Sequence, residues 1–331
     1  MKLKQAILTA VLLLGVSCQL FAQGSPKLPR IGVLWPGDVA PYNAAFLEGL
    51  RAQGYVDGVT AIIDIRSTGP DIASGGRLAA ELVALNPAVI FAVPATLARY
   101  TATAAERAGE KIPIVVLAYD PVAEGMVKSA ARPTENITGV GGAHDPELIT
   151  KLLQVVKDMV PTATRVVYLE DPTWGPTKAF PEKARTALEA AGRQLNLSVT
   201  SAELRTVEDI DRAFANAARQ RADALISTAS PFVLTHRTRI IELAAKYRLP
   251  AIYGDELFAK DGGLMSYWTS IADMHVRAAN MTAKILRGAK PSEIPVEYPA
   301  RFRLVVNLRT AKALGLTIPN TVLIQADEVL N

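Results

Sequence analysis

Residues 88–119 have the sequence AVIFAVPATLARYTATAAERAGEKIPIVVLAY. The apolar run at 88–93 predicts a buried strand, the helical spacing at 96–108 predicts a helix, and the apolar run at 114–119 predicts a second strand. Strand–helix–strand units of this kind build parallel sheets that are covered by helices on both faces. This stretch therefore predicts an α/β fold.

The same alternation continues on both sides of this unit. The elements expected before it are a strand at 31–35, a helix at 42–53 that ends at Gly54, a strand at 60–66 and a helix at 76–85. Those expected after it are strands at 165–169, 197–202, 224–228 and 251–253, and helices at 180–191 (closed by Gly192), 207–219 and 235–247. Residues 139–142, Gly-Val-Gly-Gly, are interpreted as a glycine-rich turn between the two series.

The second series repeats the first at a nearly constant distance along the chain. The matching pairs are Ile31 and Val166 (135 apart), Gly54 and Gly192 (138), Val89 and Leu225 (136), and Pro113 and Pro250 (137). A fixed offset of this kind indicates two structural units of one architecture. We therefore expect two Rossmann-like, flavodoxin-like lobes with parallel sheets.

The chain continues well beyond the second series. It is expected to form a strand at 263–267, a helix at 271–286, an extended connector at 291–299, a strand at 303–307 and a short helix at 309–314. This tail is long enough to return to the first lobe and cross back. Several crossings would act as a hinge.

Composition excludes several classes of protein. A chain of 331 residues, 50% hydrophobic and 21% charged, is globular and long enough for about two domains. The net charge of +4 comes from scattered basic residues, so no nucleic-acid partner is expected.

The first 22 residues have the pattern of a signal peptide. A basic start is followed by an uncharged stretch at 6–16 and by the small residues Ser17, Cys18 and Ala22. The apolar stretch is too short for the roughly 20 residues of a spanning helix. We expect cleavage near Ala22 and a periplasmic protein, with lipid attachment at Cys18 as the less favoured alternative. Cys18 is the one cysteine, so disulfides and cysteine chemistry are not expected in the folded body.

Candidate ligand-binding residues follow from the α/β interpretation, because ligands of parallel sheets bind beyond the carboxyl ends of the strands. The candidates are Trp35, Asp38, Tyr42, Pro94, Ala95, Thr96, Tyr119 and Asp120 in the first lobe, and Asp171, Trp174, Ser230, Pro231, Tyr253, Asp255, Glu256 and Tyr267 in the second.

These side chains suit an aromatic or amino-acid-like solute. Tyr119 and Tyr253 are 134 residues apart, occupy equivalent positions and could sandwich a flat ligand. The carboxylates could receive an ammonium group, and the backbone N–H groups of Ala95, Thr96 and Ser230 could receive a carboxylate. Each aspartate alone could instead cap a turn or a helix.

Several motifs together resemble the tryptophan/tyrosine type of ABC-transporter substrate-binding protein, over essentially the whole chain after the leader. They are FLEGLRAQGY (46–55), RPTENITG (132–139), LPAIYG (249–254), GGLMSY (262–267) and VVNLRTAKALGLTIP (305–319). The chain departs from the family pattern at VPATL (93–97), where Gly-Thr-Pro-Ala-Ala is common, and at YDPV (119–122), where Gly-Asp-Pro-Val is common. Both departures fall on the expected cleft, so the resemblance does not fix the solute.

The resemblance implies a type I periplasmic-binding-protein fold with three crossover segments, and closure of the two lobes on a small solute. The N-terminal lobe would comprise 28–143 and about 268–299, and the C-terminal lobe 144–267 and about 300–331. A monomer that delivers its solute to a membrane permease and its ATPase is expected. No enzyme activity, cofactor or metal is expected, because the histidines His144, His236 and His275 lack a metal-binding spacing and no nucleophile or phosphate-binding motif is present. A secreted α/β enzyme, and a receptor that feeds a membrane sensor, remain as alternatives.

Overall fold

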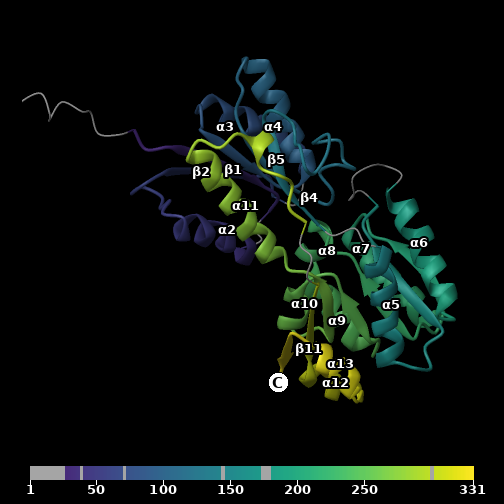
Figure 1. Cartoon of the computed structure of the whole chain (residues 1–331). Helices are drawn as coiled ribbons and strands as arrows, with labels where there is room; N and C mark the ends of the chain where they lie inside the picture. Colours follow the sequence, from purple (N-terminus) through teal and green to yellow (C-terminus); the bar gives the residue numbers. More distant parts are fainter. Residues whose placement is uncertain (1–26, 38–39, 70–71, 143–145, 173–179, 299–301) are drawn as a thin grey trace, which may run out of the picture.

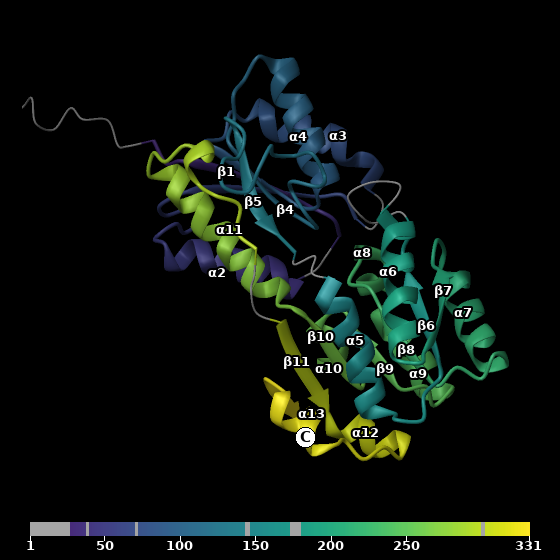
Figure 2. The same cartoon turned by 45° about the vertical axis from the view of Figure 1, so that its right-hand side comes forward.

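The computed structural model describes residues 27–37, 40–69, 72–142, 146–172, 180–298 and 302–331. The expected leader, Asp38, His144 and Trp174 lie outside these ranges. The described residues form two α/β lobes, one above the other in Figure 1, and Figure 2 shows the same arrangement after a turn. The predicted fold class is confirmed.

The first lobe is built on a five-stranded parallel sheet in the order β2-β1-β3-β4-β5. Its strands are β1 (Arg30–Trp35), β2 (Ile62–Ser67), β3 (Val89–Ala92), β4 (Ile114–Ala118) and β5 (Ile137–Gly141). Every residue of β3, β4 and β5 is buried, as expected for strands that are covered on both faces.

Strand β5 corrects the prediction of a glycine-rich turn at 139–142. Residues up to Gly141 belong to the sheet, and a side chain at Gly139 would lie within 2.0 Å of the carbonyl oxygen of Val116. Glycine is therefore required here for the close approach of two strands rather than for a turn.

Two layers of helices cover the first sheet. They are α3 (Gly75–Ala84, after the 3₁₀ turn Ile72–Ser74) and α4 (Ala95–Ala108) on one face, and α2 (Ala40–Ala52) and α11 (Ile271–Leu286, followed by the 3₁₀ turn Pro291–Glu293) on the other. Phe46 of α2 stacks on Phe91 of β3 with ring centroids 4.2 Å apart. Helix α11 comes from late in the chain, so the first lobe contains a segment that follows strands β6 to β10 of the second lobe (residues 165–269) in sequence.

The second sheet repeats the first and extends it. It contains β6 (Arg165–Glu170), β7 (Ser198–Glu203), β8 (Ala224–Ser227), β9 (Ala251–Tyr253), β10 (Met265–Thr269), β11 (Phe302–Asn307) and β12 (Glu328–Leu330) in the order β12-β11-β10-β9-β8-β6-β7. The order β7-β6-β8-β9-β10 is the same as β2-β1-β3-β4-β5, which confirms the repeat. Strand β11 is antiparallel to β10, and β12 is parallel to β11.

The helices of the second lobe depart from the predictions, which contained no helix at 146–159, 256–260 or 320–325. They are α5 (Pro146–Met159), α6 (Phe180–Gln194), α7 (Val207–Arg219), α8 (Pro231–Thr235), α9 (Arg237–Lys246), α10 (Glu256–Lys260), α12 (Leu308–Leu314) and α13 (Asn320–Gln325). Helix α6 continues past Gly192, where a side chain would lie 2.8 Å from the carbonyl oxygen of Leu197. The helix expected at 235–247 is divided at His236, and its first part begins at Pro231 because Ser230 caps it.

The chain passes between the lobes three times. It leaves the first sheet after β5 and continues into α5, and it leaves the second sheet after β10 and enters α11. Ser270 caps α11 by accepting a hydrogen bond from the N–H of Asp273. The third passage follows the bridge between Val140 and Glu297 and leads into β11.

Candidate ligand-binding cleft

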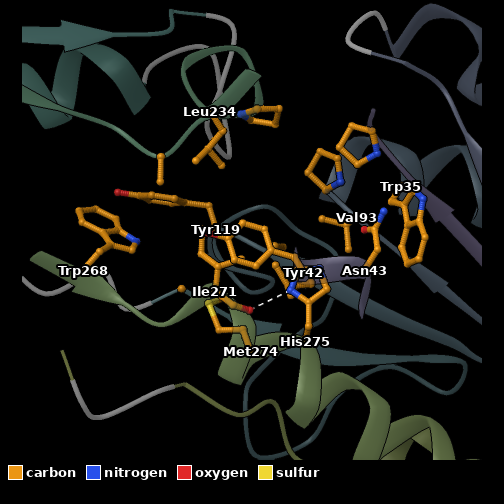
Figure 3. Close-up of a pocket in the computed structure, with 17 residues that line it drawn as sticks. Trp35, Tyr42, Asn43, Val93, Tyr119, Leu234, Trp268, Ile271, Met274 and His275 are labelled. Carbon is orange, nitrogen blue, oxygen red and sulfur yellow. Dashed lines mark hydrogen bonds between the residues drawn. The ribbon is translucent and has the colours of Figure 1, made fainter. Parts of the chain in front are cut away.

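A cleft of about 770 Å³, including space open to solvent, lies between the two lobes. Its walls come from the carboxyl ends of β1, β3, β4, β8 and β10 and from α2 and α11, where the topology of parallel sheets places ligand sites. The lining residues drawn in Figure 3 include Trp35, Tyr42, Asn43, Val93, Pro94, Tyr119, Ala229, Pro231, Leu234, Trp268, Met274 and His275.

Aromatic rings from both lobes line the cleft. Figure 3 draws Trp35 and Asn43 toward one end of the view and Tyr119 and Trp268 toward the other. Burial raises the pKa of Tyr119 well above its ordinary value, so its phenol keeps its proton and can donate a hydrogen bond. Large rings with few rotatable bonds provide contact area at a low entropic cost.

Tyr42 joins the lobes at the edge of the cleft. Its phenol, on α2, donates a hydrogen bond to Oδ1 of Asp255, which also accepts from the N–H of Leu257 at 2.8 Å. Burial raises the pKa of Asp255 to about 7. Asp255 is therefore held as the cap of α10 and as the partner of Tyr42, rather than pointing at a solute.

His275 supports this contact from α11. Its ring stacks on Tyr42 with centroids 5.7 Å apart, and its Nδ1 lies 2.8 Å from the carbonyl oxygen of Ile271. Burial lowers the pKa of His275 to about 4, so the imidazole is neutral near pH 7. A neutral ring that bonds through Nδ1 presents Nε2 as an acceptor.

The first turns of two helices lie at the cleft. Pro94 lines it, and Ala95 and Thr96 are the first residues of α4, whose N–H groups have no acceptor within the helix. Pro231 lines it from α8, while Ser230 is fully buried and its Oγ accepts from the N–H of Val233 at 3.2 Å. Pro94 and Pro231 therefore both line the cleft, whereas Ala95, Thr96 and Ser230 are not among its lining residues.

Four of the expected site residues are engaged elsewhere. The carboxylate of Asp120 closes its own turn by accepting from the N–H groups of Val122 and Ala123 and from the Tyr298 hydroxyl at 2.8 Å. Glu256 forms ion pairs with Arg303 at 2.8 Å and with Lys260 at 3.2 Å. Tyr267 stacks on Phe302 with centroids 5.8 Å apart. Asp171 is buried at the end of β6 and does not line the cleft.

Tyr253 does not face Tyr119 across the cleft, so the expected sandwich is not formed. It is 1% exposed and stacks on Phe258 with centroids 4.3 Å apart, within the core of the second lobe. A side chain at Gly263 would lie 2.6 Å from the Tyr253 ring, because that ring fills the space beside the turn before β10. Both tyrosines lie at the ends of equivalent strands, as their spacing in the sequence predicted. The spacing did not predict the direction in which each ring points.

Sequence reasoning missed other lining residues, among them Asn43, Leu234, Trp268, Met274 and His275. Trp268 lies near the carboxyl end of β10, which is parallel to β9, so the rule used for the predicted residues could have found it. Met274 and His275 lie on α11, and they reach the cleft only because that helix returns to the first lobe. No local pattern marks such a return.

The described residues contain no group of three or more His, Cys, Asp or Glu side chains placed to hold a metal ion. In the same ranges, none of the helices combines the length and apolarity needed to cross a bilayer.

The family model for the ABC transporter substrate binding protein matches residues 40–330. The chain belongs to this family. Members of the family are solute-binding proteins rather than a class of enzyme, and they work with an ABC permease and ATPase. The resemblance seen in the sequence is thereby confirmed.

Relatives of this substrate-binding protein agree with the architecture. A curated tyrosine-binding protein of Clostridioides difficile is 24% identical over 290 residues, which cover 86% of this chain and 80% of that protein. A crystal structure of an ABC domain in complex with L-Trp from Streptococcus pneumoniae has a TM-score of 0.80 at 22% identity, covering 92% of this chain and 100% of that one. A conserved domain protein from Vibrio cholerae O1 has a TM-score of 0.79 at 23% identity, with the same coverage. These likenesses confirm the two-lobed fold.

Proposed function

We propose that the protein is an extracytoplasmic receptor that captures an aromatic amino acid between its two lobes and delivers it to the permease of an ABC transporter. The observation that carries this proposal is a cleft whose walls hold Trp35, Tyr119 and Trp268 from both lobes. Each ring offers a flat apolar face, and together they favour a solute with an aromatic ring.

The first turn of α4 in the first lobe would supply donors for the polar part of such a solute. The N–H groups at the start of α4 beside Pro94 have no helical acceptor, and the positive end of the helix dipole favours an anion there. A carboxylate would meet these groups while its ring lies against the aromatic wall. Two relatives, a tyrosine-binding protein and a domain in complex with L-Trp, support the same solute class.

Binding by two lobes also supplies the signal for delivery. Solute that contacts both lobes favours the arrangement in which they are closed, and it shifts the population by its differential affinity for that state. A preference of about 3 kcal/mol corresponds to a roughly 150-fold shift. The permease would then recognise the closed form.

The proposal is tested by calorimetric titration of the purified protein with L-tryptophan, L-tyrosine and L-phenylalanine, with L-leucine and D-glucose as controls. At least one aromatic amino acid is expected to bind with a negative heat-capacity change, and the two controls are expected to bind far more weakly. Mass spectrometry of small molecules released on denaturation identifies any solute that copurifies. Tight binding of glucose or leucine without binding of an aromatic amino acid would contradict the proposal.

A further inference from the structure

The carboxyl edge of the second sheet carries a buried polar cluster that nothing above explains. Glu170 is the last residue of β6, and Thr228 directly follows β8. Because Leu169 is paired with Ser227, Glu170 and Thr228 stand opposite each other at the ends of neighbouring strands. Glu170 is 2% exposed and Thr228 is 9% exposed.

The oxygens of these side chains have no hydrogen-bond partner among the described residues. This holds for both carboxylate oxygens of Glu170 and for the Thr228 hydroxyl. Buried polar atoms in native proteins are nearly always paired, so an unpaired carboxylate and hydroxyl together need an explanation. A missing ligand group is one such explanation.

The ion pair between Glu170 and Arg185 does not satisfy these polar atoms. Nη2 of Arg185 lies 3.0 Å from Oε1 of Glu170, yet the buried Nε of the same guanidinium has no acceptor. The same Nη2 also lies 3.5 Å from Oε1 of Glu203, so one guanidinium is shared by two carboxylates. A buried carboxylate that lacks a two-pronged partner keeps lone pairs available for a further donor.

Neither Glu170 nor Thr228 lines the cleft, but Thr228 is next in sequence to a residue that does. Thr228 directly precedes Ala229, which lines the cleft together with Pro231. Tyr168 lies two residues before Glu170 and therefore on the same face of β6. After burial, Tyr168 is the next cause of the raised pKa of Tyr119, a lining residue from the first lobe.

We propose that Glu170 and the Thr228 hydroxyl receive the ammonium group of the solute. An ammonium group has three donors, which match the two carboxylate oxygens and one hydroxyl oxygen of the cluster. This inference rests on the proposed function and assigns the second lobe a polar role in it. The carboxylate of the same α-amino acid would bind at the start of α4 in the first lobe. The solute would then connect the two lobes through its two charged groups.

The test compares each amino acid with its analogue that lacks only the ammonium group. The pairs are L-tryptophan with 3-(indol-3-yl)propanoate, and L-tyrosine with 3-(4-hydroxyphenyl)propanoate. Calorimetric titration of the wild type is expected to favour the amino acid of at least one pair by about 10- to 100-fold, the range for a hydrogen bond to a charged group. In Glu170→Gln this preference should fall to within about threefold, while the affinity for the analogue is unchanged.

Glu203→Gln is the matched control, since Glu203 contacts the same guanidinium from the neighbouring strand and is exposed. It should keep the wild-type preference. An undiminished preference in Glu170→Gln would overturn the inference and leave the proposed function standing. If Glu170→Gln does not fold, as judged by circular dichroism, Thr228→Val and the wild type decide: an undiminished preference in Thr228→Val, or equal affinity of the wild type for the two members of both pairs, overturns the inference. Absence of binding to all four compounds overturns the proposed function as well.

Discussion

The phenol of Tyr42 in the first lobe donates a hydrogen bond to the carboxylate of Asp255 in the second, across 213 residues of sequence. Both side chains are almost completely buried, and Tyr42 also belongs to the packed core cluster that contains Tyr253 and Phe258. The contact lies at the edge of the cleft beside α11, where the chain has just crossed between the lobes. It connects α2 of the first lobe to the residue that caps α10 in the second.

Removing the Tyr42 hydroxyl should destabilise the protein. In Tyr42→Phe the buried carboxylate of Asp255 keeps only the N–H of Leu257 as a donor. The free energy of unfolding in urea is expected to fall by about 1–3 kcal/mol, the cost of a buried acceptor that loses its partner. Tyr100→Phe is the control, because Tyr100 is an exposed tyrosine on α4. Equal stability of the two variants would show that the Tyr42 bond contributes nothing.

The stability of the protein should depend on pH through Asp255. Its pKa is raised from 3.8 to about 7, so between these values the folded state binds more protons than the unfolded chain, and stability falls as pH rises. His275 acts in the opposite sense, because its pKa is lowered from 6.5 to about 4 and stability is lost as pH falls through that window. The two effects offset each other in the wild type.

Asp255→Asn separates these contributions. The free energy of unfolding of the variant, relative to that of the wild type, should rise by more than about 1 kcal/mol from pH 4.5 to pH 7.5. One unit of pKa shift is worth about 1.4 kcal/mol. Urea titrations at a series of pH values measure the difference. Parallel curves for the two proteins would mean that Asp255 titrates normally.

Tyr119 and Tyr253 should behave differently although they are equivalent in sequence. Tyr119→Ala removes a lining ring and is expected to weaken binding of the aromatic amino acid by more than about 1 kcal/mol, with little change in melting temperature. Tyr253→Ala empties a core position and is expected to cost about 3–5 kcal/mol of stability. Calorimetry and thermal melts of both variants check this, and a melting temperature of Tyr253→Ala equal to the wild type would contradict the core assignment.

Adjacent residues of β10 provide a second paired test. Trp268 lines the cleft, whereas Tyr267 stacks on Phe302 away from it. Trp268→Ala should therefore weaken aromatic amino acid binding by more than about 1 kcal/mol, and Tyr267→Ala should leave affinity nearly unchanged in titrations under the same conditions. The reverse order of effects would place the solute on the other face of this strand.

The architecture was predictable because it depends on local patterns that recur. Apolar runs such as 114–119 and helical stretches such as 96–108 reappear in the second lobe, and their order alone indicates parallel sheets. The rule that ligands bind at the carboxyl ends of strands then led to Trp35, Pro94, Tyr119 and Pro231, which line the cleft.

The predictions that were wrong concern contacts between elements, which the sequence of a single strand does not determine. Whether Tyr253 faces the cleft or Phe258 depends on how the following turn packs, and the role of Gly139 depends on a neighbouring strand. The carboxylates were found in the sequence, but Asp120 and Asp255 are used by their own turns and caps. Only three-dimensional packing separates a capping aspartate from one that is free to bind a solute.

The most direct test of the two-lobe mechanism is the distance between spin labels on opposite lobes, measured by pulsed electron resonance with and without solute. The folded body has no cysteine, so exposed positions Lys128 and Glu189 can be changed to Cys in a chain that carries Cys18→Ser. Addition of the aromatic amino acid that binds in calorimetry should shift the distance distribution to shorter values, while L-leucine should leave it unchanged. An identical distribution with saturating aromatic solute would contradict closure of the lobes.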